Sequence, residues 1–77
     1  IKVMSYIQML VQDMRLEMTQ WLKVDVVNRL SNEEVLKCHT HKMGNKPGLL
    51  KEEHMIDTAA YIAIVEDAIK RSNIQLR

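Results

Sequence analysis

The chain has 77 residues, 47% of them hydrophobic, and its 11 basic and 10 acidic side chains leave a formal charge of +1. This length supports one small core, so we expect a single domain that is completed by forming a homo-oligomer. The balanced charge argues against nucleic-acid binding, and no run of about 18 apolar residues is present to cross a membrane. With two Gly and one Pro, the composition favours an all-α fold over a β-rich one, which needs more turn residues.

The sequence also bears on the compartment. Cys38 is the only cysteine, so the chain has no internal disulfide, which is typical of a reducing environment. Polar side chains at Lys2, Ser5 and Gln8 interrupt the apolar residues of the N-terminus, unlike the order of a signal peptide. We therefore expect a cytoplasmic protein.

The first predicted helix covers about residues 2–22. Its apolar residues recur three or four apart along one side, which is typical of a helix that packs through a seam. Met9 and Leu16 fall outside this seam. Because one neighbouring helix in so short a chain covers little surface, we interpret the seam either as core or as a face that binds a second copy or another protein. The seam residues are Met4, Ile7, Val11, Met14, Met18 and Trp21.

The second predicted helix covers about residues 32–43, after a break or short helical turn over residues 23–30. Ser31 and Glu34 have the spacing of a capping box, in which each side chain accepts a hydrogen bond from the other residue's backbone N–H. Leu30 and Val35 flank this cap with the spacing of a hydrophobic staple. Gly44 then favours a left-handed helix end, so the limits of this helix are well defined.

The third predicted helix covers about residues 51–71, and we expect it to be the central helix of a small three-helix bundle. Glu53 and Asp57 lie one turn apart on one face, with Asp57 inside an otherwise apolar run. A buried carboxylate needs a cation, a basic partner or solvent. The pair therefore indicates either a Mg²⁺ site or a solvent edge near the helix start, where the dipole favours acids.

A zinc site is a further possibility that the spacing disfavours. Cys38 and His41 share a helix face, and with His54 and Asp57 they supply four potential ligands. However, structural zinc sites carry paired Cys or His spacings that this chain lacks. We expect a small buried cysteine and exposed histidines instead.

Two stretches carry a family resemblance. Residues 30–35 read Leu-Ser-Asn-Glu-Glu-Val, and residues 53–61 read Glu-His-Met-Ile-Asp-Thr-Ala-Ala-Tyr, with Lys42-Met43 and a short loop between. This pattern, over roughly residues 30–68, resembles the C-terminal half of small phage and bacterial proteins related to the MazG-like all-α nucleotide pyrophosphohydrolases. The resemblance implies a dimerising helical bundle, carboxylate-bound Mg²⁺, and hydrolysis of a nucleoside triphosphate to a monophosphate and pyrophosphate.

The resemblance also implies site residues. It matches Glu53 and Asp57 to the family's last acidic pair, with Glu33 and Glu34 as further candidate metal ligands. Lys37 stands where better-known members carry another acid, so an incomplete, degenerate relative is expected as well. Phosphate contacts would fall to the lysines near the loop, which are Lys42, Lys46 and Lys51.

Two hypotheses of different classes follow. The first is a Mg²⁺-dependent MazG-like nucleoside triphosphate pyrophosphohydrolase, or a degenerate relative of one, with a nucleotide as its ligand. The second is a non-catalytic helical interaction module, phage-encoded in one version, that binds itself or a host protein through the Met-rich seam of the first helix.

Overall fold

The computed structural model describes the backbone of residues 2–44 and 52–75 and the side chains of residues 8–44 and 53–73. Within those residues the regular structure is helical throughout, which confirms the all-α prediction. The elements are α1 (Lys2–Met18), α2 (Val24–Arg29), α3 (Asn32–Lys42), the short 3₁₀ turn η1 (Glu52–His54) and α4 (Thr58–Gln75). No helix of this described part is long and apolar enough to span a membrane.

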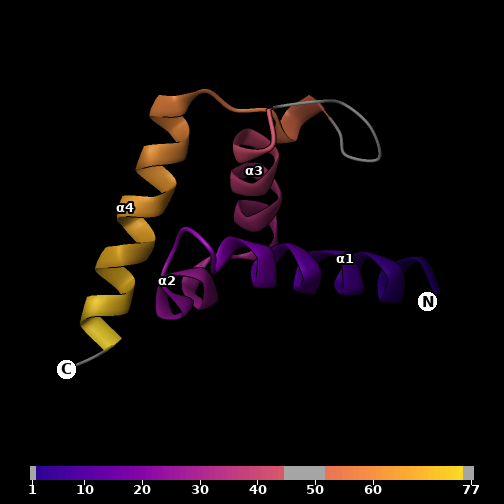
Figure 1. Ribbon diagram of the computed structural model, residues 1–77, viewed down its shortest axis with the longest axis horizontal. Coiled ribbons are helices and arrows are strands. Elements are labelled where there is room, and N and C mark those ends of the chain that lie inside the picture. Colours follow the sequence, from indigo (N-terminus) through magenta and orange to yellow (C-terminus); the bar gives the residue numbers. More distant parts are fainter. Residues whose placement is uncertain (1, 45–51, 76–77) are drawn as a thin grey trace.

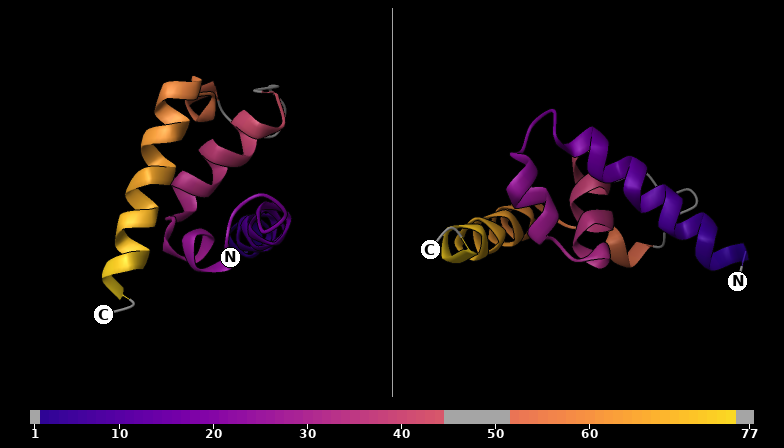
Figure 2. Two further views of the ribbon diagram at one scale, coloured as in Figure 1. Left: turned by 60° about the vertical axis from the view of Figure 1, so that its left-hand side comes forward. Right: turned by 90° about the horizontal axis from the view of Figure 1, so that it is seen from below.

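Helix α3 is the central element of the molecule. It lies between α1 and α4, and it also packs against η1 (Figure 1). Helix α4 packs mainly on α2 and then on α3, whereas α1 runs across the base of α3 and projects away from α4 (Figure 2). The expectation that the third predicted helix is central is therefore wrong, because α4 covers one flank of the bundle.

The core lies where the four helices converge. Val35 and Cys38 of α3 are fully buried at its centre, and Ala68 is the α4 residue buried among them. Helix α1 contributes the inward side of its predicted seam, and α2 contributes both of its buried valines. The remaining buried apolar residues are Val11, Met14, Met18, Val26, Val27 and Leu30.

Helix α1 ends at Met18, four residues before the predicted limit. The Thr19 hydroxyl donates to the Leu16 carbonyl at 2.5 Å, and the backbone N–H groups of Trp21 and Leu22 both bond to the Met18 carbonyl. Such local side-chain bonds compete with the helical ladder, so the chain turns here and re-enters the bundle as α2. Helix α2 corresponds to the short helical turn that was one of the two predictions for residues 23–30.

The start of α3 follows the sequence prediction in detail. The Glu34 N–H donates to the Ser31 hydroxyl at 3.1 Å, and the Ser31 N–H donates to the Glu34 carboxylate at 2.9 Å. Leu30 and Val35 are both buried beside this capping box, as a hydrophobic staple requires. Gly44 has a φ of 99°, which confirms the left-handed end after α3.

The third predicted helix is interrupted. Instead of a continuous helix over residues 51–71, η1 ends at His54, residues 55–57 are extended or irregular, and α4 begins at Thr58. The Asp57 carboxylate accepts a hydrogen bond from the Ala60 N–H at 2.8 Å. Asp57 thus acts as an N-cap, and a capping residue has non-helical backbone angles that end any preceding helix.

Two arginines fix the corner between α2 and α3. Arg15 of α1 donates to the carbonyls of Val27 at 2.6 Å and Leu30 at 2.9 Å, which close the end of α2. Arg71 of α4 donates to the Arg29 carbonyl at 2.9 Å, and its guanidinium also pairs with carboxylates on α3 and α4. A cation at a helix C-terminus satisfies unpaired carbonyls and complements the helix dipole.

Candidate functional site

The described residues contain one cluster of three potential metal ligands: Glu33, Glu53 and His54. One ligand atom from each lies within 4.8 Å of the others. His54 is 7% exposed, whereas both glutamates are exposed to solvent. The cluster therefore presents two carboxylates at the surface, backed by a buried imidazole.

Two elements bring this cluster together. Glu33 lies in the first turn of α3, between the capping-box residues Ser31 and Glu34, where the helix dipole favours an acid. The short η1 turn packs on α3 and places the Nε2 atom of His54 2.8 Å from a Glu33 carboxylate oxygen. The Nδ1 atom of His54 is buried and has no hydrogen-bond partner. The sequence placed Glu33 and Glu53 among the candidate ligands but did not join them to His54.

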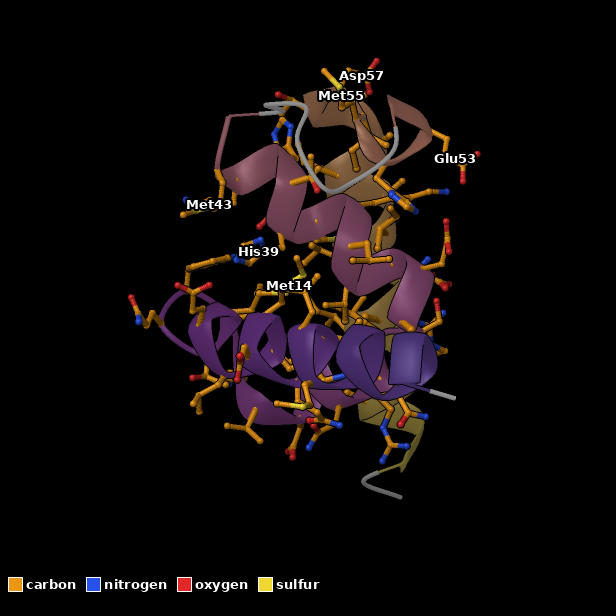
Figure 3. All side chains as sticks on the ribbon, turned by 90° about the vertical axis from the view of Figure 1, so that its right-hand side faces the viewer. Met14, His39, Met43, Glu53, Met55 and Asp57 are labelled. Carbon is orange, nitrogen blue, oxygen red and sulfur yellow. The ribbon has the colours of Figure 1, made fainter. Side chains whose placement is uncertain are left out.

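The predicted pairing of Glu53 with Asp57 is not formed. The two side chains project from different parts of the 52–58 segment (Figure 3), since residues 55–57 break the helix that would have stacked them. Asp57 instead caps α4. Glu34 is also engaged elsewhere, because its carboxylate closes the capping box and accepts from Arg71 at 3.1 Å.

Of the predicted phosphate-binding lysines, the structure describes Lys42, and its position is away from this cluster. Lys42 lies at the opposite end of α3 from Glu33, about 13 Å away along the helix axis, at about 1.5 Å per residue. Its Nζ atom is 5.6 Å from the centroid of the Trp21 ring, a cation–π arrangement. Lys46 and Lys51 lie outside the described residues.

The predicted interaction seam of the first helix faces inward where the structure describes it. Val11, Met14 and Met18 are buried in the chain's own core, and Trp21 packs against that core while partly exposed. The assignment of these three buried residues to an exposed binding face is thus corrected. Met14, for example, points from α1 toward α3 (Figure 3). The side chains of Met4 and Ile7, the two remaining seam residues, lie outside the described part.

The prediction of a buried cysteine is confirmed, whereas the prediction of exposed histidines is wrong. Cys38 is buried, and this burial, with a smaller contribution from the Glu34 carboxylate, raises the pKa of its thiol to about 11. A neutral thiol of this kind is a poor nucleophile and a poor metal ligand.

The histidines, expected to be exposed, are instead partly or fully buried at contacts between elements. His39 pairs with Glu17 at 2.7 Å. His41 lies beside Tyr61, with their ring centroids 4.9 Å apart.

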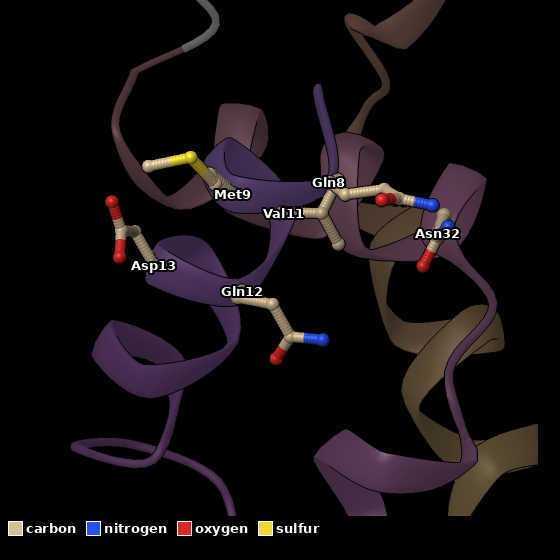
Figure 4. A pocket seen from close by; sticks show the side chains of 6 residues that line it. All are labelled: Gln8, Met9, Val11, Gln12, Asp13 and Asn32. Carbon is tan, nitrogen blue, oxygen red and sulfur yellow. The ribbon is translucent and has the colours of Figure 1, made fainter. Parts of the chain in front are cut away.

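A second surface of interest lies on the outside of α1 and α2. Two shallow grooves, of about 530 Å³ and 450 Å³, share Gln12 and Asp13 as lining residues. Met9 borders the first groove (Figure 4), and Leu16 and Val24 border the second. We call this the α1–α2 outer surface, made of Met9, Gln12, Asp13, Leu16 and Val24.

Comparisons with protein-family models, with curated proteins and with solved structures found no match. The resemblance to nucleotide pyrophosphohydrolases therefore stays a prediction.

Proposed function

We propose that this protein is a non-catalytic helical interaction module that associates with a second copy of itself through the α1–α2 outer surface. The observation that carries the proposal is the exposure of large apolar side chains there: Met9 is 66% exposed, Leu16 72% and Val24 57%. Isolated exposed apolar residues are ordinary, but several that border adjoining grooves with a polar rim are typical of an interaction site.

The position of these residues on α1 supports the proposal. Met9 and Leu16 are seven residues apart, so they lie on the same side of the helix, with Gln12 and Asp13 between them. This side is opposite to the buried side formed by Val11, Met14 and Met18. Among the described residues, helix α1 therefore has apolar side chains on both faces, and only one of these faces is covered by other described residues.

The total surface area favours a second copy as the occupant. The chain exposes 5657 Å², whereas a compact monomer of 9.0 kDa is expected to expose about 4,850 Å². The difference of roughly 800 Å² equals one partner's share of a standard interface. The radius of gyration of 12.6 Å also exceeds the roughly 11.5 Å expected for a chain of this length. Pairing of two copies through the α1–α2 outer surface would bury part of this exposed area.

The test is the oligomeric state measured by sedimentation equilibrium over a range of protein concentrations. We expect a reversible dimer, and we expect Leu16→Gln to weaken it at least about tenfold, because burying a leucine contributes about 1.5–3 kcal/mol. Glutamine keeps the helix propensity and approximate size of the side chain. A matched control is Ile62→Gln, which replaces a 47% exposed apolar residue on α4. A strict monomer, or equal weakening by both variants, would contradict the proposal.

A second candidate function is the Mg²⁺-dependent nucleotide pyrophosphohydrolase, and one observation favours it. Glu53 lies with Glu33 in an exposed cluster that a metal-bound nucleotide could approach. Carboxylates of this kind hold Mg²⁺ while leaving coordination positions for water and phosphate oxygens. The site would be formed by Glu33 and Glu53, with Asp57 in a structural role.

This second candidate is tested by pyrophosphate release from a panel of nucleoside triphosphates with Mg²⁺ or Mn²⁺. Glu53→Gln should abolish release, because it removes a charged ligand while keeping the side chain's size. Asp57→Asn should retain it, because asparagine caps a helix as well as aspartate does. Absence of pyrophosphate release from every nucleotide would rule this function out and leave the interaction module unaffected.

A further inference from the structure

We infer that Glu33, Glu53 and His54 form a binding site for a transition-metal dication of the zinc type, which joins η1 to the first turn of α3. The proposed interaction module does not require this site, whereas the second candidate function would use two of its residues, Glu33 and Glu53, for Mg²⁺. Glu33 lies twenty residues before Glu53 in the chain and on a different element, yet one potential ligand atom from each of the three residues already lies within 4.8 Å of the others. Such convergence of an imidazole and two carboxylates is a donor set that proteins use for metals.

The geometry requires only a small adjustment to enclose an ion. Zinc binds nitrogen and oxygen ligands at about 2.0–2.2 Å, so the ligand atoms around it stand roughly 3.3 Å apart. His54 Nε2 and the Glu33 carboxylate are already 2.8 Å apart. Glu53 is exposed, so its side chain can rotate to complete the site without disturbing the core.

Burial of the imidazole distinguishes this cluster from an ordinary acidic surface. The side chain of His54 is 9% exposed, and its Nδ1 atom is buried without a hydrogen-bond partner. The buried ring thus lies against two exposed carboxylates. A dication would also offset the charges of Glu33 and Glu53, whose nearest potential ligand atoms lie within 4.8 Å of each other.

The donor set discriminates between metals. Mg²⁺ favours an all-oxygen octahedral shell, whereas imidazole nitrogen suits zinc and neighbouring transition metals. With three protein ligands, a fourth position stays open to water. Ligating histidines usually donate their other N–H to an acceptor, and loss of such a partner typically costs 10–100-fold in affinity. Because His54 Nδ1 lacks one, we expect a micromolar site rather than a nanomolar one.

The experiment is calorimetric titration of the full chain with ZnCl₂ at pH 7.5, with MgCl₂ as a parallel titrant. We expect one zinc per chain and no measurable heat from Mg²⁺ at the same concentrations. Glu53→Gln, an exposed and isosteric change, should weaken zinc binding at least about tenfold. Circular dichroism would show that the variant keeps its helices.

The chain offers a matched control in the other histidine–carboxylate pair. His39 lies 2.7 Å from Glu17, which is as close as His54 is to Glu33, but this pair belongs to no three-ligand cluster among the described residues. Glu17→Gln should therefore leave zinc binding unchanged. As a second measurement, zinc should slow amide hydrogen exchange in η1, because it would hold residues 52–54 against α3. Absence of zinc binding, equal affinity for Mg²⁺, unchanged binding by Glu53→Gln or unchanged exchange in η1 would each overturn the inference.

Discussion

At the scale of single residues, Asp57 has a different role from the one its sequence context indicated. A carboxylate within an apolar run looks like a ligand, yet in the structure it accepts the Ala60 N–H and starts α4. Helix capping satisfies a backbone donor that would otherwise lack a partner. The same residue type serves both roles, and only the backbone conformation distinguishes them.

The capping role leads to a stability prediction. Asp57→Ala should lower the free energy of unfolding by about 1 kcal/mol, because the first turn of α4 loses its side-chain acceptor. Asp57→Asn should change it by much less, since asparagine is an equally good cap. Urea denaturation followed by circular dichroism measures both values. Equal losses in the two variants would show that the carboxylate charge, rather than the cap, stabilises the protein.

Cys38 gives a prediction about pH. Burial raises the pKa of its thiol from 9.0 to about 11, so the unfolded chain loses this proton before the folded chain does. The free energy of unfolding should therefore be unaffected by this group below pH 9 and should fall as the pH rises from 9 toward 11. Burial also raises the pKa of the Tyr61 hydroxyl, which extends the fall to higher pH.

The measurement is urea denaturation at a series of pH values from 7 to 10.5. Cys38→Ala serves as the control, because it removes the thiol and should flatten the decline above pH 9 even though it is less stable at every pH. Stability that rises between pH 9 and 10.5 in the wild-type protein would contradict the assignment.

At the scale of elements, the corner between α2 and α3 organises the bundle. Helix α2 has six residues, too few to be stable alone, so its persistence depends on contacts from neighbouring helices. Arg15 from α1 and Arg71 from α4 both donate to carbonyls that end this helix. Each arginine thereby links a long helix to the corner and holds α2 in place.

The role of Arg15 is open to a direct test. Arg15→Met keeps an apolar stem but removes the hydrogen bonds to the Val27 and Leu30 carbonyls, so we expect the free energy of unfolding to fall by about 1.5–3 kcal/mol. Arg29→Met replaces an exposed arginine side chain in the same region and should change it by less than about 0.5 kcal/mol. Chemical denaturation compares the two, and similar values would show that the corner does not depend on Arg15.

At the scale of the whole molecule, the structure is open for its mass. Its extents of 38 × 29 × 19 Å reflect α1 projecting from the bundle, with large apolar side chains on the side away from the core. A small chain stabilises such an arrangement by association, because the core that it can bury alone is limited.

Association predicts a melting temperature that depends on protein concentration. Raising the concentration should raise the melting temperature of the wild-type chain, since dimer formation stabilises the folded state by mass action. Leu16→Gln should remove most of this dependence while keeping the helical content. Differential scanning calorimetry at several concentrations provides the measurement, and a constant melting temperature for the wild-type chain would count against a dimer.

Local signals in the sequence predicted local structure well. The helical class, the capping box of Ser31 and Glu34, the staple of Leu30 and Val35, and the left-handed Gly44 all depend on residues within a few positions of one another. The apolar spacing continues through Asp57 and so predicts one helix over residues 51–71, whereas α4 begins at Thr58. At Asp57 the apolar spacing favours a continuous helix, whereas the aspartate side chain favours the start of a new one. The sequence by itself does not show which of the two structures is more stable.

The sequence by itself determined the all-α class, the start and end of α3 and the apolar seam on α1, because backbone hydrogen bonding and side-chain periodicity act over short distances. The tertiary structure decided which face of α1 is buried, that α3 is central, and that Glu53 lies with Glu33 and His54 rather than with Asp57. These outcomes depend on contacts between elements far apart in the chain. Such contacts follow from how the whole set of apolar faces packs, and local spacing does not contain that information.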